Sequence, residues 1–351
     1  MSDTDTLVIY FNARIHGMKS GLYNRAALEE FLGQDDLQKL VEGLLDSDYR
    51  TELAVALTRH EGADAIEDAL SRNLAATFNH MLKGSTGEFA DLVRIFLTRW
   101  DLAAVKGLLR ARHWGLDQEE AVTELNPGPS LPIALVRELA RLESMPALIN
   151  ALVSWNRELC QGLRKAMDQY NESNDLAVLE DALDRTYFVE TLKKLRSSED
   201  PNALLLAEYL RAELDRINLR TLFMAVEGGA GANAQFLPGG NLSETRLKAM
   251  AATGDAAAAF GQLESTSYAD LLDEYLQFVQ SKRFAPIERY FERLLMKNLL
   301  KLSRRDVFGI GVMMNYVWLK YNEVINLRLI ARGLAGSIPV GRVRDELYFA
   351  A

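Results

Sequence analysis

The sequence has few of the residues that build disulfide frameworks, metal sites and β-sheets. One cysteine, Cys160, stands among 351 residues, which excludes an internal disulfide and a site with several thiolate ligands. The four histidines all lie in the first third of the chain and no two have the HExxH spacing, so we expect no metal site. Eight prolines and few runs of β-branched residues argue against an all-β fold.

No apolar stretch is long enough to cross a membrane. The longest, residues 307–319, has 13 residues, whereas a membrane-spanning helix needs about 20. The first apolar stretch follows two acids and no base, which is the reverse of a secretory signal. We therefore expect a cytoplasmic protein that meets a membrane only at its surface or through a partner.

Basic residues are fewer than acidic ones. Lys and Arg number 40 against 49 Asp and Glu, a net charge of −9, whereas a general nucleic-acid binder is more often basic. We expect no nucleic-acid partner. The content of apolar residues, 48%, and of charged residues, 25%, is that of a globular chain and argues against disorder.

Helical periodicity is what the sequence has in abundance. Leu37, Leu40, Val41 and Leu44, for example, fall on one face of a helix. Comparable patterns predict helices over residues 35–45, 64–82, 88–112, 132–142, 146–170, 175–195 and 201–226, and further helices from 243 onward. Breaks are expected at Asn126–Ser130 and in the Gly-rich segment 228–241. The sequence therefore predicts an all-α fold with no substantial sheet.

One pattern occurs three times. It consists of an acid, two residues, Asn or Ala, an aliphatic residue and a base, and each copy continues into apolar residues and then a glycine. The copies are Asp101–Lys106, Asp215–Arg220 and Glu323–Arg328, at offsets of 114 and 108 residues. Such long, regular spacing predicts three homologous helical domains, which we place at residues 1–125, 126–241 and 242–351. Chance similarity between helices is the alternative.

The repeated acid and Asn lie three residues apart, on one turn of a helix. We expect them to hold each other and a nearby loop backbone, while the aliphatic residue faces the core.

No reactive constellation is present. The nearest approach to a phosphate-binding loop, Gly17–Ser20, has a methionine between glycine and lysine and no glycine at the required upstream position. No Gly-x-Ser-x-Gly elbow occurs, and Cys160 lies in a helical pattern where a packed side chain is expected. We predict no catalytic residue, no cofactor and no metal.

Three segments resemble one family. They are Asn12–Ser20, Tyr321–Gly333 and Ile338–Tyr348, and together with the repeated motifs they resemble the C subunit of bacterial and archaeal V/A-type ATPases, the counterpart of the eukaryotic d subunit. The resemblance covers nearly the whole chain and is most specific at the C-terminal end. His16 and Gly17 depart from the pattern, and the Gly-rich segment 228–240 looks like a local elaboration.

The resemblance implies a funnel of three similar helical domains around a pseudo-threefold axis. It implies a non-catalytic rotor component between the central stalk and the membrane proteolipid ring, peripheral to the inner face of the cell membrane. The direction of ATP turnover and the choice between protons and sodium are left open. The alternatives are a helical scaffold unrelated to ATPases and a helical enzyme using scattered carboxylates.

The two motif-rich ends of the chain are locally basic. The residues responsible are Arg14, Lys19, Arg328, Arg332, Arg342 and Arg344. We expect some of them to meet acids on the stalk, with plain solvation as the alternative. Among apolar segments, residues 235–239 are a candidate surface for the ring, whereas 316–319 are expected to pack in the core.

Overall fold

The computed structural model describes residues 3–34, 36–118, 122, 125, 127–229, 234–281, 285–305 and 308–349, and within these ranges the regular elements are helices, with no strand. The helices are α1 (Asp3–Ser20), α2 (Arg25–Leu32), α3 (Leu37–Leu45), α4 (Arg50–Ala56), α5 (Gly62–Gly84), α6 (Gly87–Trp114), α8 (Ile133–Ala140), α9 (Met145–Trp155), α10 (Arg157–Ser173), α11 (Ala177–Asp184), the π-helical turn η1 (Arg185–Val189), α12 (Glu190–Arg196), α13 (Pro201–Glu227), α14 (Glu244–Ala251), α15 (Ala256–Gly261), α16 (Leu271–Ser281), α17 (Ala285–Arg305), α18 (Ile310–Ala335) and α19 (Val340–Glu346). The predicted all-α class is confirmed.

Most of the expected helices occur where the periodicity places them, and one does not. The long helices α5, α6 and α13 match the predicted ranges to within two residues. The helix expected over 146–170 is instead broken at Asn156, which adopts an extended backbone. Its side chain accepts a hydrogen bond from the Leu159 amide and caps α10. Asn is a favoured N-cap, and here that local preference overrides the continuous apolar pattern.

The chain forms two compact units. Unit 1 comprises residues 1–101, 126–133 and 299–351, and unit 2 comprises residues 102–125 and 134–298. This division does not test the three predicted domains, which stay a prediction. Around the first predicted boundary, residues 119–121, 123, 124 and 126 lie outside the described ranges.

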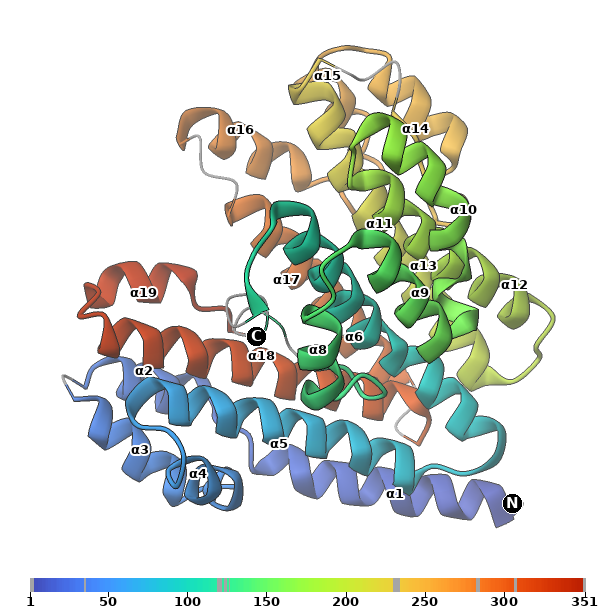
Figure 1. The fold of residues 1–351 in the computed structure, drawn as a ribbon. Helices are drawn as coiled ribbons and strands as arrows, with labels where there is room; N and C mark the ends of the chain where they lie inside the picture. Colours follow the sequence, from blue (N-terminus) through green and yellow to red (C-terminus); the bar gives the residue numbers. More distant parts are fainter. Residues whose placement is uncertain are drawn as a thin grey trace. The chain divides into compact units, whose positions relative to one another are not determined.

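Unit 1 is built around α5 and α18, which lie side by side (Figure 1). Trp318 of α18 contacts Trp100, and Trp100 in turn contacts Phe78 of α5, with ring centroids 5.8 and 5.0 Å apart. Tyr316, Val317 and Trp318 are all buried. The prediction that residues 316–319 pack in the core is therefore confirmed for these three.

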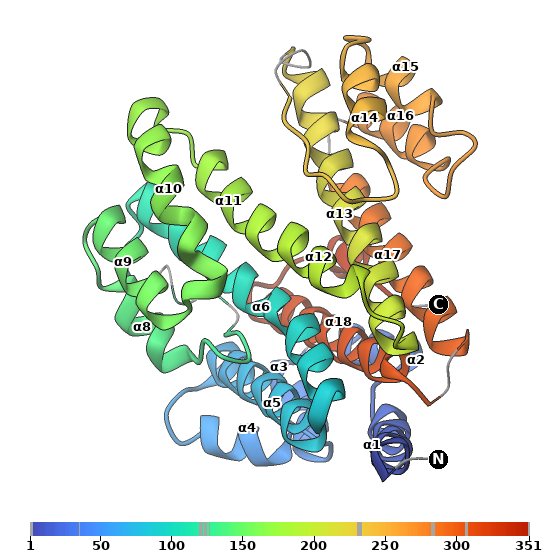
Figure 2. The same ribbon diagram turned by 90° about the vertical axis from the view of Figure 1, so that its right-hand side faces the viewer.

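Unit 2 contains a large core that includes the C-terminal half of α13 and helices α14, α15 and α16 (Figure 2). Phe223 of α13 packs against Phe260, Tyr275 and Phe278. Phe236 and Leu237 are also buried, and Phe236 belongs to this core. The prediction that segment 235–239 offers its apolar residues to a partner is wrong, because they are used inside the unit. Residues 230–233 of the Gly-rich segment lie outside the described ranges.

Candidate functional site

Asp215, near the middle of α13, is a fully buried carboxylate surrounded by hydrogen-bond donors. It accepts from the backbone amides of Asn241 and Leu242, at 3.1 and 3.0 Å. The Asn241 side-chain amide and the Tyr268 hydroxyl also donate to it, at 2.9 and 2.6 Å. Burial raises the pKa of Asp215, and these donors oppose the rise. The carboxylate therefore fastens α13 to the loop that precedes α14.

Asp101 makes the equivalent connection from α6. It accepts from the backbone amides of Ser130 and Leu131, both at 3.0 Å, and from the Ser130 hydroxyl at 2.6 Å. Burial raises its pKa to about 6 in spite of these bonds. This carboxylate fastens α6 to the loop that precedes α8.

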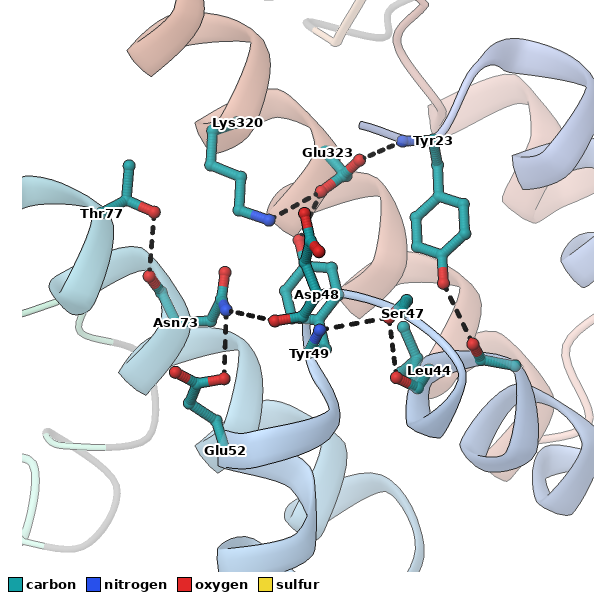
Figure 3. Close-up of polar contacts among 11 residues, drawn as sticks. Tyr23, Leu44, Ser47, Asp48, Tyr49, Glu52, Asn73, Thr77, Lys320 and Glu323 are labelled. Carbon is teal, nitrogen blue, oxygen red and sulfur yellow. Dashed lines mark hydrogen bonds and ion pairs between the residues drawn. The ribbon is translucent and has the colours of Figure 1, made fainter. Parts of the chain in front are cut away.

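Glu323 of α18 makes the third connection, but to the other end of the chain. The Tyr23 amide and the Tyr49 hydroxyl donate to it, the latter at 2.6 Å, and Lys320 forms an ion pair with it at 3.0 Å (Figure 3). Tyr49, Lys320 and Glu323 are all buried. We call the three carboxylates with their donors the Asp101, Asp215 and Glu323 joints.

The donor segments of two joints match in detail. Tyr49 follows Tyr23 by 26 residues, and Tyr268 follows Leu242 by the same number. The Tyr49 amide bonds the Ser47 hydroxyl at 3.2 Å, and the Tyr268 amide bonds the Thr266 hydroxyl at 3.1 Å. Sequence reasoning missed these donors, although residues 44–49 (LLDSDY) and 263–268 (LESTSY) share a pattern that could have revealed them.

The repeated asparagines also hold loop backbone, as predicted. Asn218 donates to the Leu237 carbonyl and accepts from its amide, both at 2.8 Å. Asn326 makes the same pair of bonds with Tyr348, at 2.6 and 3.0 Å. Within the described residues, neither asparagine bonds the acid of its own motif, so that part of the prediction is wrong. The aliphatic residues that follow, Val105, Leu219 and Leu327, are buried as expected.

Two of the joints are flanked by a second set of polar contacts. In unit 2, Lys106 pairs with Asp184 at 2.6 Å, and Arg110 makes two bonds to Glu180 at 2.6 and 2.9 Å.

The same arrangement occurs in unit 1. Arg328 donates to the Ser71 hydroxyl at 2.6 Å, and Arg332 makes two bonds to Glu67 at 2.6 and 3.0 Å. These bases lie five and nine residues after the acid in both cases. The ninth position after Asp215 is Met224, which is 58% exposed.

The structure separates the six basic residues that the sequence singled out. Arg328 and Arg332 belong to the contacts just described, and burial lowers the pKa of Arg328. Arg344 pairs with Glu29 at 2.9 Å while its side chain stays half exposed.

Arg14, Lys19 and Arg342 have no ion-pair partner within the described ranges, and Arg14 and Arg342 are exposed. Burial, and secondarily the charge of Arg14, lower the pKa of His80.

An exposed apolar turn accompanies Arg342. It joins α18 to α19, with Ile338 and Val340 at 44% and 36% exposure on either side of Pro339. Ser337 adopts a left-handed backbone, φ 50°, which sets the direction of this turn. An apolar turn bordered by a cation is suited to bind a surface with both apolar and acidic residues.

The described residues contain neither a candidate metal site nor a helix that could span a membrane. Within them, no group of three or more His, Cys, Asp or Glu is placed to hold a metal ion. No helix in the part of the chain that the structure describes is long and apolar enough to span a membrane. The single cysteine, Cys160, is buried.

Comparison with known proteins points to one family. The profile of the ATP synthase (C/AC39) subunit family matches residues 11–346. The chain is 26% identical to the C subunit of the A-type ATP synthase of Methanocaldococcus jannaschii, over 96% of this chain and 85% of the relative. It is 28% identical to the protein of the same name from Haloquadratum walsbyi, over 96% of this chain and 97% of the relative.

Proposed function

Since the chain belongs to the ATP synthase (C/AC39) subunit family, we propose that it is a non-catalytic rotor adaptor of a V/A-type ATPase. In this role it couples the central stalk to the membrane proteolipid ring during ATP-driven ion transport or ATP synthesis. It sits at the inner face of the cell membrane and meets the membrane only through its partners in the complex. Family membership counts against the alternative of an unrelated helical scaffold.

The repeated joints are the observation that carries this proposal. A part that transmits torque must resist deformation, and close-packed helices give a body of low compressibility. Asp101 and Asp215 fix helix to loop through three or more bonds each, and Glu323 does so through two, at points where a sliding helix would have to break them together. Their recurrence at similar registers supports three similar domains, 1–125, 126–241 and 242–351, around a pseudo-threefold axis.

The chain ends supply the proposed stalk contact. Arg14, Lys19 and Arg342 are the candidates that are not engaged in ion pairs within the described ranges, and Arg344 is half exposed. Arg328 and Arg332 act within the chain instead, holding α18 to α5. Acids on the stalk would orient against this basic end, and Ile338 and Val340 would contribute apolar contact beside it.

Capture from solubilised membranes tests the role. The tagged chain should bring down stalk and proteolipid subunits together, and the purified chain should hydrolyse no ATP. Recovery of neither partner, or turnover of ATP by the chain alone, would refute the proposal.

A charge reversal tests the proposed stalk contact. Arg342→Glu should weaken stalk binding by roughly tenfold at low salt and less at high salt, because exposed charges mainly steer association. Arg59→Glu is the matched control, since Arg59 is exposed and, like Arg342, has no ion-pair partner within the described ranges. An equal loss in both variants would show a general effect of charge and remove Arg342 from the contact.

A further inference from the structure

We propose that residues 21–49 form a strap that closes over the buried Lys320–Glu323 pair and opens as one unit while the other two joints stay shut. The strap comprises Gly21 to Tyr49 and contains α2 and α3. Its opening is a sub-global event of the kind that native-state exchange detects in many proteins.

The contacts show that the strap does for Glu323 what residues 240–268 do for Asp215. In each case an amide at the start of the segment and a tyrosine hydroxyl at its end donate to one buried carboxylate. The two segments are equally long between these donors. The chain thus closes its last joint with its own N-terminal part, across separations of 274 and 300 residues.

The strap is a coherent piece. The Tyr23 hydroxyl donates to the Gly43 carbonyl at 3.2 Å, and its ring contacts Phe31 edge to face, so the start of the segment is bound to both helices. Phe31 in turn lies against Gly43, where a Cβ would come within 2.5 Å of its ring. These contacts lie inside the strap and can persist when it opens.

The strap closes against α5 and against the C-terminal part of the chain. Asn73 of α5 donates to the Asp48 carbonyl at 3.0 Å, and most of the other polar closing contacts lie on α18 and the residues after it. Besides Glu323, they include the Lys320 ammonium over the Tyr49 ring at 3.9 Å and the Arg344–Glu29 pair. Arg25 lies over the Phe349 ring at 4.7 Å. The contacts to Glu323, Lys320, Arg344 and Phe349 join the strap to the C-terminal part of the chain, and they break together with the Asn73 bond when the strap leaves.

The charge pair makes this joint easier to open than the one at Asp215. The side chains of Lys320 and Glu323 are 5% and 3% exposed, so both ions lose their hydration when the strap closes. Both residues lie on α18, so opening returns that hydration without separating the pair, and this offsets part of the strap contacts that are lost. The donors to Asp215 are neutral, and no ion pair of that carboxylate lies within the described residues, so its opening regains the hydration of one charge only.

Hydrogen exchange on the full chain tests the strap. In low urea, the wild-type amides of α2 and α3 should share one opening whose urea dependence is smaller than that of global unfolding. Amides of 242–268 should open less often. Strap amides that exchange only through global unfolding, or independently of one another, would overturn the proposal.

Two variants sharpen the test. Tyr49→Phe should raise strap exchange by roughly tenfold and leave 242–268 unchanged, because one hydrogen bond to a charged group is lost. Tyr268→Phe is the matched control and should leave the strap unchanged. The double variant Lys320→Met with Glu323→Gln should slow strap opening several-fold, since no charge then regains hydration. Equal effects of both tyrosine changes, or faster opening in the double variant, would count against the strap.

Discussion

Asp101, Asp215 and Glu323 are acids placed where acids are rarely found, and each is tolerated because its oxygens are satisfied. Every one is less than 4% exposed, and each accepts from at least one backbone amide. An unpaired carboxylate at such a depth would be strongly destabilising, so these residues specify a geometry more than they add stability. Loss of their hydrogen bonds should therefore lower the stability of the fold more than loss of their charge does.

Replacing Asp101 separates these two effects. Asp101→Asn should fold, since its oxygen can still accept from the two amides and its NH₂ can donate to the Ser130 hydroxyl. Asp101→Ala should cost about 2–3 kcal/mol in unfolding free energy, because buried donors lose their partner. Urea unfolding measures both, and equal losses would show that the bonds are not what matters.

The same pair of proteins should differ in pH dependence. Burial raises the folded-state pKa of Asp101 from 3.8 to about 6, so the folded state holds this proton more tightly than the unfolded state does. Its favourable contribution is complete below the unfolded pKa and is lost as the pH rises through about 6. Wild-type stability relative to Asp101→Asn should therefore fall between pH about 4 and 6, and a constant difference would contradict the assignment.

The neighbouring ion pairs should differ according to burial. Lys106→Met should destabilise by roughly 3 kcal/mol, because it leaves Asp184, which is 3% exposed, without its cation. Arg110→Met should cost less than about 1 kcal/mol, since the Arg110 side chain is 42% exposed. Thermal or urea unfolding shows which variant loses more unfolding free energy. A larger loss in Arg110→Met would show that Asp184 regains hydration when Lys106 is replaced.

At the scale of elements, the fold depends on close approach between helices as much as on amphipathic pattern. Gly162 of α10 lies against α11 and η1, where an added Cβ would come within 2.7 Å of the Thr186 hydroxyl and 3.0 Å of the Ala182 carbonyl. Gly17 of α1, in contrast, faces open space. The two glycines look alike in the sequence, because each interrupts a helical pattern.

Alanine substitutions should therefore have opposite effects at these two positions. Gly162→Ala should destabilise by about 1–3 kcal/mol through overpacking against backbone that cannot move freely. Gly17→Ala should stabilise by about 0.5–1 kcal/mol, because alanine favours the helix and loses less backbone entropy on folding. Calorimetry on both variants checks the signs, and destabilisation at Gly17 would mean that α1 has a covering partner.

At the scale of the whole molecule, the proposed adaptor role predicts indifference to nucleotide. A ligand that binds the folded state raises the unfolding temperature by mass action. Because we expect no nucleotide site, Mg-ATP at millimolar concentration should leave the unfolding temperature of the purified chain unchanged. The sequence lacks the glycine cradle that holds phosphates. A shift that grows with ATP concentration would reopen the question of a nucleotide site.

The sequence alone determined the class of fold, the long helices and the three acid-containing motifs, because each is a local pattern that recurs with the period of a helix or at long fixed spacing. It could not show that Phe236 and Leu237 are buried, since burial of a loop depends on what lies opposite. Nor could it show that Arg328 and Arg332 bind within the chain.

Only the tertiary structure decided how the chain ends meet. Glu323 reads as one more helical acid, and Tyr23 and Tyr49 as ordinary aromatics near the other terminus. Their meeting depends on the packing of α2 and α3 against α18, which no local pattern encodes. A buried carboxylate must have hydrogen-bond donors, but these donors can come from any part of the chain. The sequence around the carboxylate therefore does not show where its partners lie.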